Sequence, residues 1–442
     1  MNKPFAAIRR SALALASTTL LLGSAFAQEP PAVDEAAFRS CLAQLQGSSA
    51  FRAVDAASFT RFTQGLAPDP SVLVLLDRQP EFTLPVWDYI AVLVDDERVA
   101  DGRAAYAKWQ DTLRRIEQQT GVAPNVVVGV WGVESNFGQN LGGRPLVQSL
   151  ATLSCFGRRQ AYFRGEFAAA LRILQEGHIA PDKLVGSWAG AFGQTQFMPS
   201  TFFRSAVDFD GDGRRDIVDS VPDALASTAK FLQNAGYRRG EPWGFEVQLP
   251  PGFDTSDAGR KNRRPIDAWR RAGLTLADGS ALPDTLPSAG LLIPARGRTA
   301  GGASGTGPAF LVGRNFDTLY SYNASENYAL AIAQLSNLVA NPGGRRFRHA
   351  LAHRRPRPVA RAEPRAANPA AGARPRHRQR RRHDRRQNAR GHQGRTAAPG
   401  LQARWPRRPE AAAGAARGLR PPSRIFRVKQ AASALASSAG SY

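Results

Sequence analysis

The feature that most constrains this fold is an abrupt change of composition near residue 343. Residues 344–442 contain 25 arginines and one lysine against three acidic residues, so their net charge of +23 equals that of the whole chain. They include few aliphatic or aromatic side chains, and such a segment cannot bury enough apolar surface to offset its ordering entropy. We therefore expect a disordered Arg/Pro/Ala-rich tail over 344–442, preceded by a folded body without net charge.

The origin of this tail has two explanations. Arg, Ala, Pro and Gly dominate it while Lys is nearly absent, and those four residues have GC-rich codons. This bias favours a frameshift in a GC-rich gene that replaced the true C-terminal segment. The alternative is a genuine cationic tail that associates with anionic cell-wall polymers. Because the folded body carries no net charge, we expect no nucleic-acid partner. Nucleic-acid binding would have to depend on the basic tail alone.

Residues 1–27 have the organisation of a cleavable signal peptide. A basic start, "MNKPFAAIRR", is followed by the apolar "SALALASTTLLLGSA" and by a small-x-small cleavage motif at residues 25–27. The apolar run is too short to span a bilayer, and a retained N-terminal anchor is the alternative. No cysteine closely follows it, so we do not expect a lipoprotein. These features predict a secreted, periplasmic protein, which we expect to be a monomer.

The mature chain has two cysteines, Cys41 and Cys155. An oxidising compartment permits a disulfide between them. Two buried free thiols are the alternative, and the spacing of the residues does not decide between the two.

Hydrophobic periodicity and Gly/Pro punctuation divide the body into four regions. Residues 28–120 are predicted to form an N-terminal helical region, in which "PEFTLPVWDYI" (80–90) reads as an extended connection. Residues 121–242 are a dense block of helices broken by glycine-rich turns. Residues 243–320 change to a small β-rich region with a flexible loop at 298–308, and residues 321–343 return to a helix. This order predicts an α+β protein, mostly helical with a small β insertion.

The stretch "VVVGVWGVESNFG" (126–138) places a glutamate, Glu134, at the end of an apolar run. A helix beginning near Pro124 puts Glu134 on the same face as Val130 and Trp131. Apolar surroundings and the negative end of a helix both disfavour the charged form of a carboxyl group. A carboxyl group that stays protonated near neutral pH can act as a general acid. A structural glutamate satisfied by a salt bridge is the alternative.

A second segment, "GSWAGAFGQTQFMPSTF" (186–202), combines glycines with uncharged polar residues. Ser187, Gln194 and Gln196 offer hydrogen bonds beside the apolar side chains of Phe197 and Met198. This mixture suits a sugar, which presents hydroxyl groups at its edges and C–H groups on its faces. A tightly packed helix pair with a glycine kink is the alternative.

Residues 208–219, "DFDGDGRRDIVD", match the spacing of a calcium-binding loop. The candidate ligands are Asp208, Asp210, Asp212, the carbonyl group of Arg214, Asp216 and Asp219, with Asp223 as an alternative last ligand. The aspartate at position 12 is shorter than the usual glutamate, so we expect modest affinity. A solvated acidic turn is the alternative.

Taken in order, "ESNFG", "GSWAGAFGQTQFMPSTF" and "YNASENYALAIAQLS" resemble the bacterial lytic murein transglycosylases of the family-B type, from about residue 35 to 340. The resemblance implies a lysozyme-like catalytic core over 121–242, completed by 321–343, with an EF-hand-like loop that holds a structural Ca²⁺. It also implies cleavage of the β-1,4 bond between N-acetylmuramic acid and N-acetylglucosamine in peptidoglycan strands, with no cofactor for catalysis. Association with other cell-wall enzymes would be compatible with it.

Carried over residue by residue, the resemblance makes Glu134 the catalytic acid/base. It places Ser187, Gln196, Met198, Tyr322, Asn323 and Tyr328 on sugar-contacting positions. The structural alternative for the tyrosines is packing at the start of a helix. Glu134 would protonate the leaving oxygen and then accept the proton of the muramyl 6-hydroxyl group, which gives a 1,6-anhydro product. Neither "VWGVESNFGQNLGGRP" nor "GSWAGAFGQTQFMPSTF" contains a second acid, whereas most glycosidases use two.

Other interpretations remain open at this point. A hydrolytic muramidase would need a second carboxylate that positions water. A calcium-stabilised wall-binding protein would bind peptidoglycan without cleaving it. Residues 258–273 form a basic stretch, "AGRKNRRPIDAWRRAG". We favour a solvated charged surface, and the alternative is a surface that faces the acidic stem peptides of peptidoglycan.

Overall fold

The computed structural model describes residues 32–76, 86–294, 308–341, 343–344 and 346–348. The predicted signal peptide, the 298–308 loop except its last residue, and nearly all of the basic tail lie outside these residues. The helices are α1 (Glu35–Gln46), α2 (Ala56–Thr63), α3 (Ser71–Leu76), α4 (Val86–Leu93), α5 (Asp96–Lys108), α6 (Gln110–Thr120), α7 (Pro124–Ser135), α8 (Leu146–Cys155), α9 (Gln160–Gln175), α10 (Pro199–Ser205), α11 (Val221–Asn234), α12 (Ile266–Arg271), α13 (Arg314–Asn323) and α14 (Glu326–Ala340), with a 3₁₀ turn at Ser49–Phe51. The strands are β1 (Arg144–Pro145), β2 (Val185–Gly186), β3 (Gly244–Gln248), β4 (Arg263–Pro265), β5 (Thr275–Leu276), β6 (Ser288–Leu292) and β7 (Ala309–Val312).

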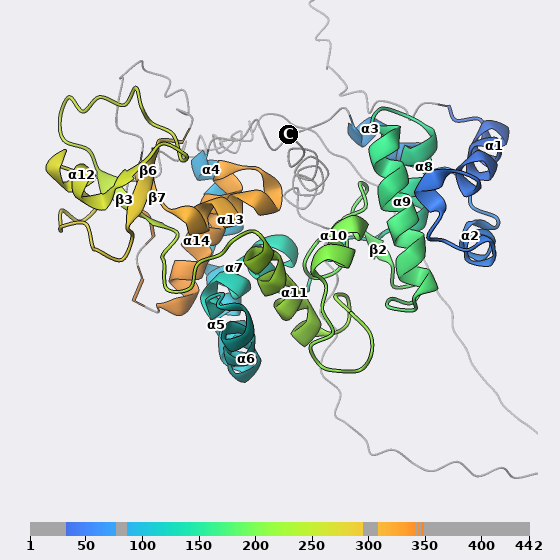
Figure 1. Ribbon diagram of the computed structural model, residues 1–442, viewed down its shortest axis with the longest axis horizontal. Coiled ribbons are helices and arrows are strands. Elements are labelled where there is room, and N and C mark those ends of the chain that lie inside the picture. The colour runs from blue at the N-terminus through green and yellow to red at the C-terminus, as the bar shows by residue number, and fades with distance from the viewer. Residues whose placement is uncertain (1–31, 77–85, 295–307, 342, 345, 349–442) are drawn as a thin grey trace, which may run out of the picture. The chain divides into compact units, whose positions relative to one another are not determined.

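The predicted α+β class is confirmed, since the chain is mainly helical with two small antiparallel sheets (Figure 1). Within the described ranges, none of the helices combines the length and apolarity needed to cross a bilayer.

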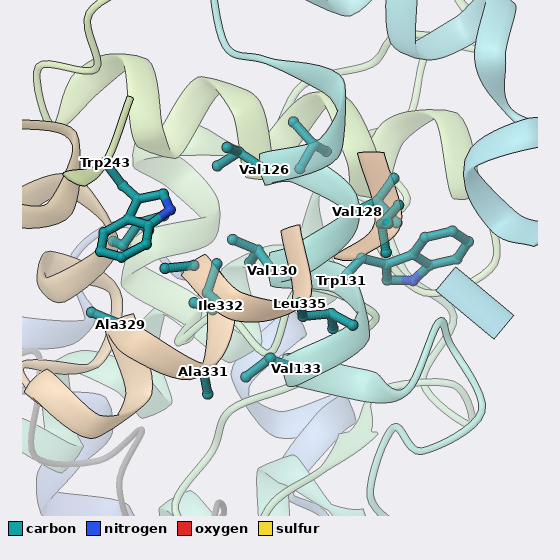
Figure 2. Packing of buried hydrophobic residues seen from close by; sticks show 14 of the residues in the cluster. Val126, Val128, Val130, Trp131, Val133, Trp243, Ala329, Ala331, Ile332 and Leu335 are labelled. Carbon is teal, nitrogen blue, oxygen red and sulfur yellow. The ribbon is translucent and has the colours of Figure 1, made fainter. Parts of the chain in front are cut away.

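Helices α7 and α14 form the centre of the first hydrophobic core. Every residue of α7 from 126 to 135 is buried, and Figure 2 shows its valines and Trp131 packed beside Ile332 and Leu335 of α14. The valines of α7 are mediocre helix formers, so burial must hold the helix. Gly129 permits the close approach, because a Cβ atom there would lie 2.1 Å from the Oγ atom of Ser336.

The predicted N-terminal helical region is divided between two cores. Helices α4, α5 and α6 pack with α7 and α14 in the first core. The apolar residues of α1 to α3 belong instead to a second core, which they build with α8 and α9. The expectation of an extended connection over 80–90 was wrong for its last five residues: 86–93 form α4, because the apolar Val86, Ile90 and Leu93 fall on one buried face. Residues 80–85 lie outside the described part of the chain.

A disulfide joins α1 to the end of α8 in this second core, between Cys41 and Cys155. The same core continues into the 186–202 segment through Trp188, Phe192 and Phe197. The chain between α9 and α10 is therefore anchored by buried aromatic side chains, although it contains little regular structure.

The β-rich region is a five-stranded antiparallel sheet with the strand order β4-β6-β7-β3-β5. Alternate residues of a strand point to opposite faces, and β7 shows this clearly. Ala309 and Leu311 face a small core that includes Trp269 of α12, whereas Phe310 and Val312 belong to the first helical core. Through Phe310 and Val312 the sheet packs against the first core, to which α13 and α14 also contribute.

Candidate active site

The turn that ends α7 places Glu134 at the edge of the core. Glu134 is 8% exposed, and the next turn is made by Asn136 and Phe137, which both have positive φ angles of 51° and 56°. Non-glycine residues in this conformation are strained and persist only where neighbours hold them. Arg98 of α5 donates a hydrogen bond to the Asn136 side chain (3.0 Å), so the turn after Glu134 is braced from outside the helix.

Two tyrosines lie close enough to Glu134 to be influenced by its charge, the buried Tyr328 and the half-buried Tyr322. The hydroxyl group of Tyr328 donates a hydrogen bond to Oε1 of Glu134, across 194 residues of sequence. Burial raises the pKa of Tyr328 well above its usual range, and the negative charge of Glu134 adds to the effect. Burial and the same charge also raise the pKa of Tyr322, whose ring stacks on that of Tyr328 at 6.2 Å. Both phenols therefore stay neutral donors at physiological pH.

Tyr322 links the 321–343 segment to the glycine-rich 186–202 segment. Its hydroxyl group donates to the main-chain oxygen of Thr195 (2.7 Å), and its ring lies 4.6 Å from that of Phe231. The neighbouring Asn323 has a buried Oδ1 atom without a hydrogen-bond partner in the described residues. A buried acceptor without a partner is costly, and a ligand N–H group could relieve that cost.

The predicted sugar-contacting residues of the 186–202 segment are all held tightly. Gln196 has a positive φ angle of 50°, and its amide group donates to the main-chain oxygens of Leu141 and Gly193. Met198 precedes the first turn of α10 and is 4% exposed. Ser187 is fully buried, and its hydroxyl oxygen accepts the N–H group of Ala191 at 2.9 Å. This last geometry makes Ser187 part of a turn.

Two bracing residues of the site were not predicted as functional. Gln194 was noted only as a possible hydrogen-bonding residue of its segment, yet its side chain contacts both Trp131 and Val218. Arg98 lies in a predicted helix, 38 residues before the turn that it braces. Arg98 belongs to no motif, and nothing in the 186–202 motif distinguishes Gln194 from Ser187 or Gln196, so the sequence did not indicate that either residue braces α7.

The acidic loop 208–219 brings three of its predicted ligands together. The carboxylates of Asp208, Asp210 and Asp212 are exposed, with oxygen atoms within 4.8 Å of one another. Both oxygens of Asp208 also accept main-chain N–H groups, from Gly211 and Gly213, which fold the loop around it. Clustered carboxylate oxygens are the ligands that Ca²⁺ prefers, so these three residues fit the ion.

Two of the other predicted ligands, Asp216 and Asp219, have protein partners. Asp219 is exposed and pairs with Lys183 at 3.4 Å. The Arg214 side chain pairs with Asp212, and Oδ1 of the buried Asp216 accepts the N–H groups of Val218 and Asp219.

Asp223 is fully buried, and its carboxylate oxygens accept the N–H groups of Phe209, Asp210 and Asp216. Its oxygens thereby shape the loop.

The basic stretch 258–273 is not a free cationic surface. Arg260 and Arg263 both form ion pairs with Asp317 of α13, and the Arg260 guanidinium group stacks on Tyr320 at 3.7 Å. Arg264 pairs with Asp257 at 2.6 Å. These three arginines are therefore paired rather than free to bind acidic peptides, and two of them, Arg260 and Arg263, fasten the β-rich region to α13.

The described chain is mainly helical, and Glu134 lies buried near the end of α7, beside Tyr328. Residues 37–337 match the family described as "Transglycosylase SLT domain". The match covers more than half of the chain, which therefore belongs to this family of transglycosylases, as the motifs indicated.

Relatives with established names cover most of the folded body. The chain is 32% identical over 293 residues to "Membrane-bound lytic murein transglycosylase B" of Escherichia coli, a match that covers 61% of this chain and 74% of the relative. It is similar to SltB3 of Pseudomonas aeruginosa, solved in complex with NAG-anhNAM-pentapeptide, with 42% identity, a TM-score of 0.64, and coverage of 72% and 80% of the two chains. The Escherichia coli lytic transglycosylase Slt35, solved in complex with calcium, matches with 30% identity, a TM-score of 0.57, and coverage of 70% and 93%.

Proposed function

We propose that this protein is a lytic transglycosylase that cleaves the β-1,4 bond between N-acetylmuramic acid and N-acetylglucosamine of peptidoglycan and releases 1,6-anhydro products. The observation that carries the proposal is the buried Glu134 at the end of α7, hydrogen-bonded to Tyr328. Family membership and the resemblance to enzymes solved with peptidoglycan fragments support it.

In the first step, Glu134 acts as a general acid. Its proton passes to the glycosidic oxygen while the bond between that oxygen and the anomeric carbon breaks, and the N-acetylglucosamine leaves with a free 4-hydroxyl group. Because Oε1 accepts the hydrogen of Tyr328, the acidic proton belongs on Oε2. The muramyl centre then carries positive charge, which the substrate's own acetamido group and the dipoles of the groove stabilise.

In the second step, the same residue acts as a base. Glu134 is now a carboxylate, and it takes the proton of the muramyl 6-hydroxyl group. The 6-oxygen attacks the anomeric carbon and closes the 1,6-anhydro ring, so no water enters the product. Tyr328 continues to donate to Oε1 and stabilises the carboxylate between the two steps. One carboxyl group is thus sufficient for both proton transfers.

Residues around Glu134 supply sugar contacts. We assign this role to Gln196, Met198, Tyr322, Asn323 and Tyr328. Tyr328 contacts Glu134 directly, and Tyr322 joins its segment to the 186–202 segment through Thr195. The unpartnered Oδ1 atom of Asn323 suits the N–H group of an acetamido substituent. Ser187, which is fully buried in a turn, supports the groove from behind.

The acidic loop would hold a structural Ca²⁺ with Asp208, Asp210 and Asp212. The ion would stabilise the loop by neutralising three carboxylates, and it would take no part in bond cleavage. The signal-like start of the sequence supports export of the enzyme to the periplasm. Peptidoglycan, the proposed substrate, lies in that compartment.

The products distinguish this proposal from a hydrolytic muramidase. We would digest purified peptidoglycan with the mature protein in ¹⁸O-labelled water and analyse the released muropeptides by mass spectrometry. Anhydro-muropeptides, lighter than reducing ones by one water and free of label, would support the proposal. Labelled reducing ends would show hydrolysis and require a second carboxylate. Binding without any product would favour the non-catalytic wall-binding alternative.

A further inference from the structure

Gln194 occupies an unusual position beside the end of α7. Its side-chain oxygen accepts the indole N–H group of Trp131 at 3.0 Å, and its amide nitrogen donates to the main-chain oxygen of Val218 at 2.9 Å. Its main-chain oxygen accepts the hydroxyl group of Ser135 at 2.8 Å, and its main-chain N–H group donates to Ile217 at 2.8 Å. With 5% exposure, this one residue joins two parts of the chain that are far apart in sequence.

The two contacts on α7 flank the catalytic carboxyl group. Trp131 lies one helical turn before Glu134, and Ser135 follows it directly. Ser135 also accepts the N–H group of Gly138 at 3.0 Å, so it anchors the strained turn that follows. A Cβ atom at Gly138 would lie 2.7 Å from Oε1 of Gln194, which shows how closely the turn fits against this side chain.

The contacts on the other side reach a rigid segment. Val218 and Asp219 donate their N–H groups to the buried carboxylate of Asp216. The N–H group of Asp216 in turn donates to Asp223, and both carboxylates are buried. Gln194 is therefore fixed at one end by a hydrogen-bonded network and can hold α7 at the other.

We propose that Gln194 is a positioning residue for Glu134, which fixes the end of α7 through Trp131 and Ser135. Its hydrogen bonds go to residues on both sides of Glu134 and to the 217–218 segment, so it sets where the carboxyl group of Glu134 points. The proposal rests on the role of Glu134 proposed above. Displacement of a catalytic group by about 1 Å can lower the rate about 100-fold, so a loosened helix end should reduce turnover more than substrate binding.

The test compares Gln194→Met with Gln334→Met in the mature protein. Gln334 is a matched control, because it is 2% exposed and hydrogen-bonds to Phe347 rather than to α7. We expect Gln194→Met to lower kcat by about 10- to 100-fold with little change of KM. Gln334→Met should leave kcat near that of the wild type even where its Tm falls. A folded Gln194→Met variant with wild-type kcat would overturn the proposal.

A spectroscopic readout tests the contact without activity. The indole ¹H–¹⁵N resonance of Trp131, identified by its loss in Trp131→Phe, should move in Gln194→Met and stay in place in Gln334→Met. An unmoved resonance in Gln194→Met would contradict the hydrogen bond.

Ser135→Ala serves as a second variant if Gln194→Met does not fold, since it removes the other contact on α7. We expect kcat to fall there too, and a wild-type kcat would overturn the proposal. Failure of the proposed function would look different: Glu134→Gln would then keep wild-type activity, or the wild type would release no products.

Discussion

At the scale of single residues, the site depends on a hydrogen bond between a carboxyl group and a neutral phenol. Tyr328 donates to Glu134, while Tyr322 donates to Thr195. A hydrogen bond to a charged group is worth about 1.5–3 kcal/mol, and each 1.36 kcal/mol changes a rate tenfold. The two tyrosines therefore make different contributions, although their rings stack on each other.

We predict that Tyr328→Phe lowers kcat by about 10- to 100-fold, because the carboxylate formed after the first proton transfer loses its donor. Tyr322→Phe is the matched control, with the same change of one hydroxyl group. It should lower kcat less, since its hydrogen bond goes to a main-chain oxygen. Initial rates of muropeptide release from the two variants check this. Equal losses in both would show that the hydrogen bond to Glu134 has no special role.

The raised pKa of Tyr328 also predicts a loss of stability in alkali. An unfolded tyrosine ionises near pH 10, while the folded pKa of Tyr328 lies well above that value. Above about pH 10 the unfolded state thus releases a proton that the native state keeps, so stability falls as pH rises towards the folded pKa. Tyr328→Phe should show a shallower fall of Tm between pH 9 and pH 11 than the wild type. Parallel curves would contradict this interpretation.

The sequence predicted the roles of some of these residues but not of others, because some contacts form only between residues far apart in the chain. The apolar run before Glu134 predicted its burial. Tyr328 entered only through resemblance to a family, because its contact with Glu134 crosses 194 residues. Gln194 was predicted only to offer hydrogen bonds to a ligand, because its bracing role depends on four hydrogen bonds that exist only in the folded chain.

At the scale of elements, close packing compensates for the weak helix propensity of α7. The residue types of α7 favour strand over helix, yet contact with α14 determines the outcome (Figure 2). The wrong prediction of an extended connection at α4 has a related cause. Short apolar runs after prolines can form a strand or a helix, and burial against α14 makes Val86–Leu93 helical.

We predict that Gly129→Ala destabilises the protein by about 1–3 kcal/mol, because the new Cβ atom would meet Ser336 at 2.1 Å and force α7 and α14 apart. Gly165→Ala is the control, as another helical glycine with no atom within 4 Å of the position of the new Cβ. Alanine is the better helix former, so this control should gain roughly 0.5–1 kcal/mol. Urea unfolding of both variants measures the difference. A stable Gly129→Ala variant would mean that the two helices are not closely packed.

At the scale of the whole molecule, a disulfide and an acidic loop outside the catalytic site should affect the stability of the fold. The disulfide between Cys41 and Cys155 closes a segment of 114 residues, and the acidic loop gathers three carboxylates. The disulfide lies in the second core, and the three carboxylates are exposed, so both should influence unfolding more than the chemistry. Sequence spacing pointed to a loop in which the carboxylates of Asp208, Asp210 and Asp212 lie close together. It could not reveal that Asp219 faces Lys183 or that Asp223 accepts main-chain hydrogen bonds.

We predict that Cys41→Ala/Cys155→Ala lowers the free energy of unfolding by about 2–4 kcal/mol, since a long loop in the unfolded chain regains its freedom. Denaturant unfolding of this variant and of the reduced wild type should agree. The kcat of the folded variant should remain near that of the wild type. A large loss of kcat at full folding would show that the second core shapes the site directly.

We predict that Ca²⁺ raises the Tm of the wild type, because a ligand that binds only the native state stabilises it by mass action. Asp210→Asn removes one of the three clustered carboxylates and should reduce the shift. Asp219→Asn should leave it in place, since Asp219 pairs with Lys183. Thermal scans with Ca²⁺ and with a chelator provide the measurement. Identical wild-type curves would mean that 208–219 is a solvated acidic turn.

The central claim is that Glu134 alone serves as both acid and base, and the Glu134→Gln variant tests it most directly. An amide cannot donate a proton as an acid, but it preserves the shape of the side chain. We would measure muropeptide release by the mature wild type and by this variant, with Tm and glycan binding as controls. We predict a folded variant that binds glycan strands and releases no anhydro-muropeptides. Near-normal release of these products would contradict the claim and move the acid to another residue.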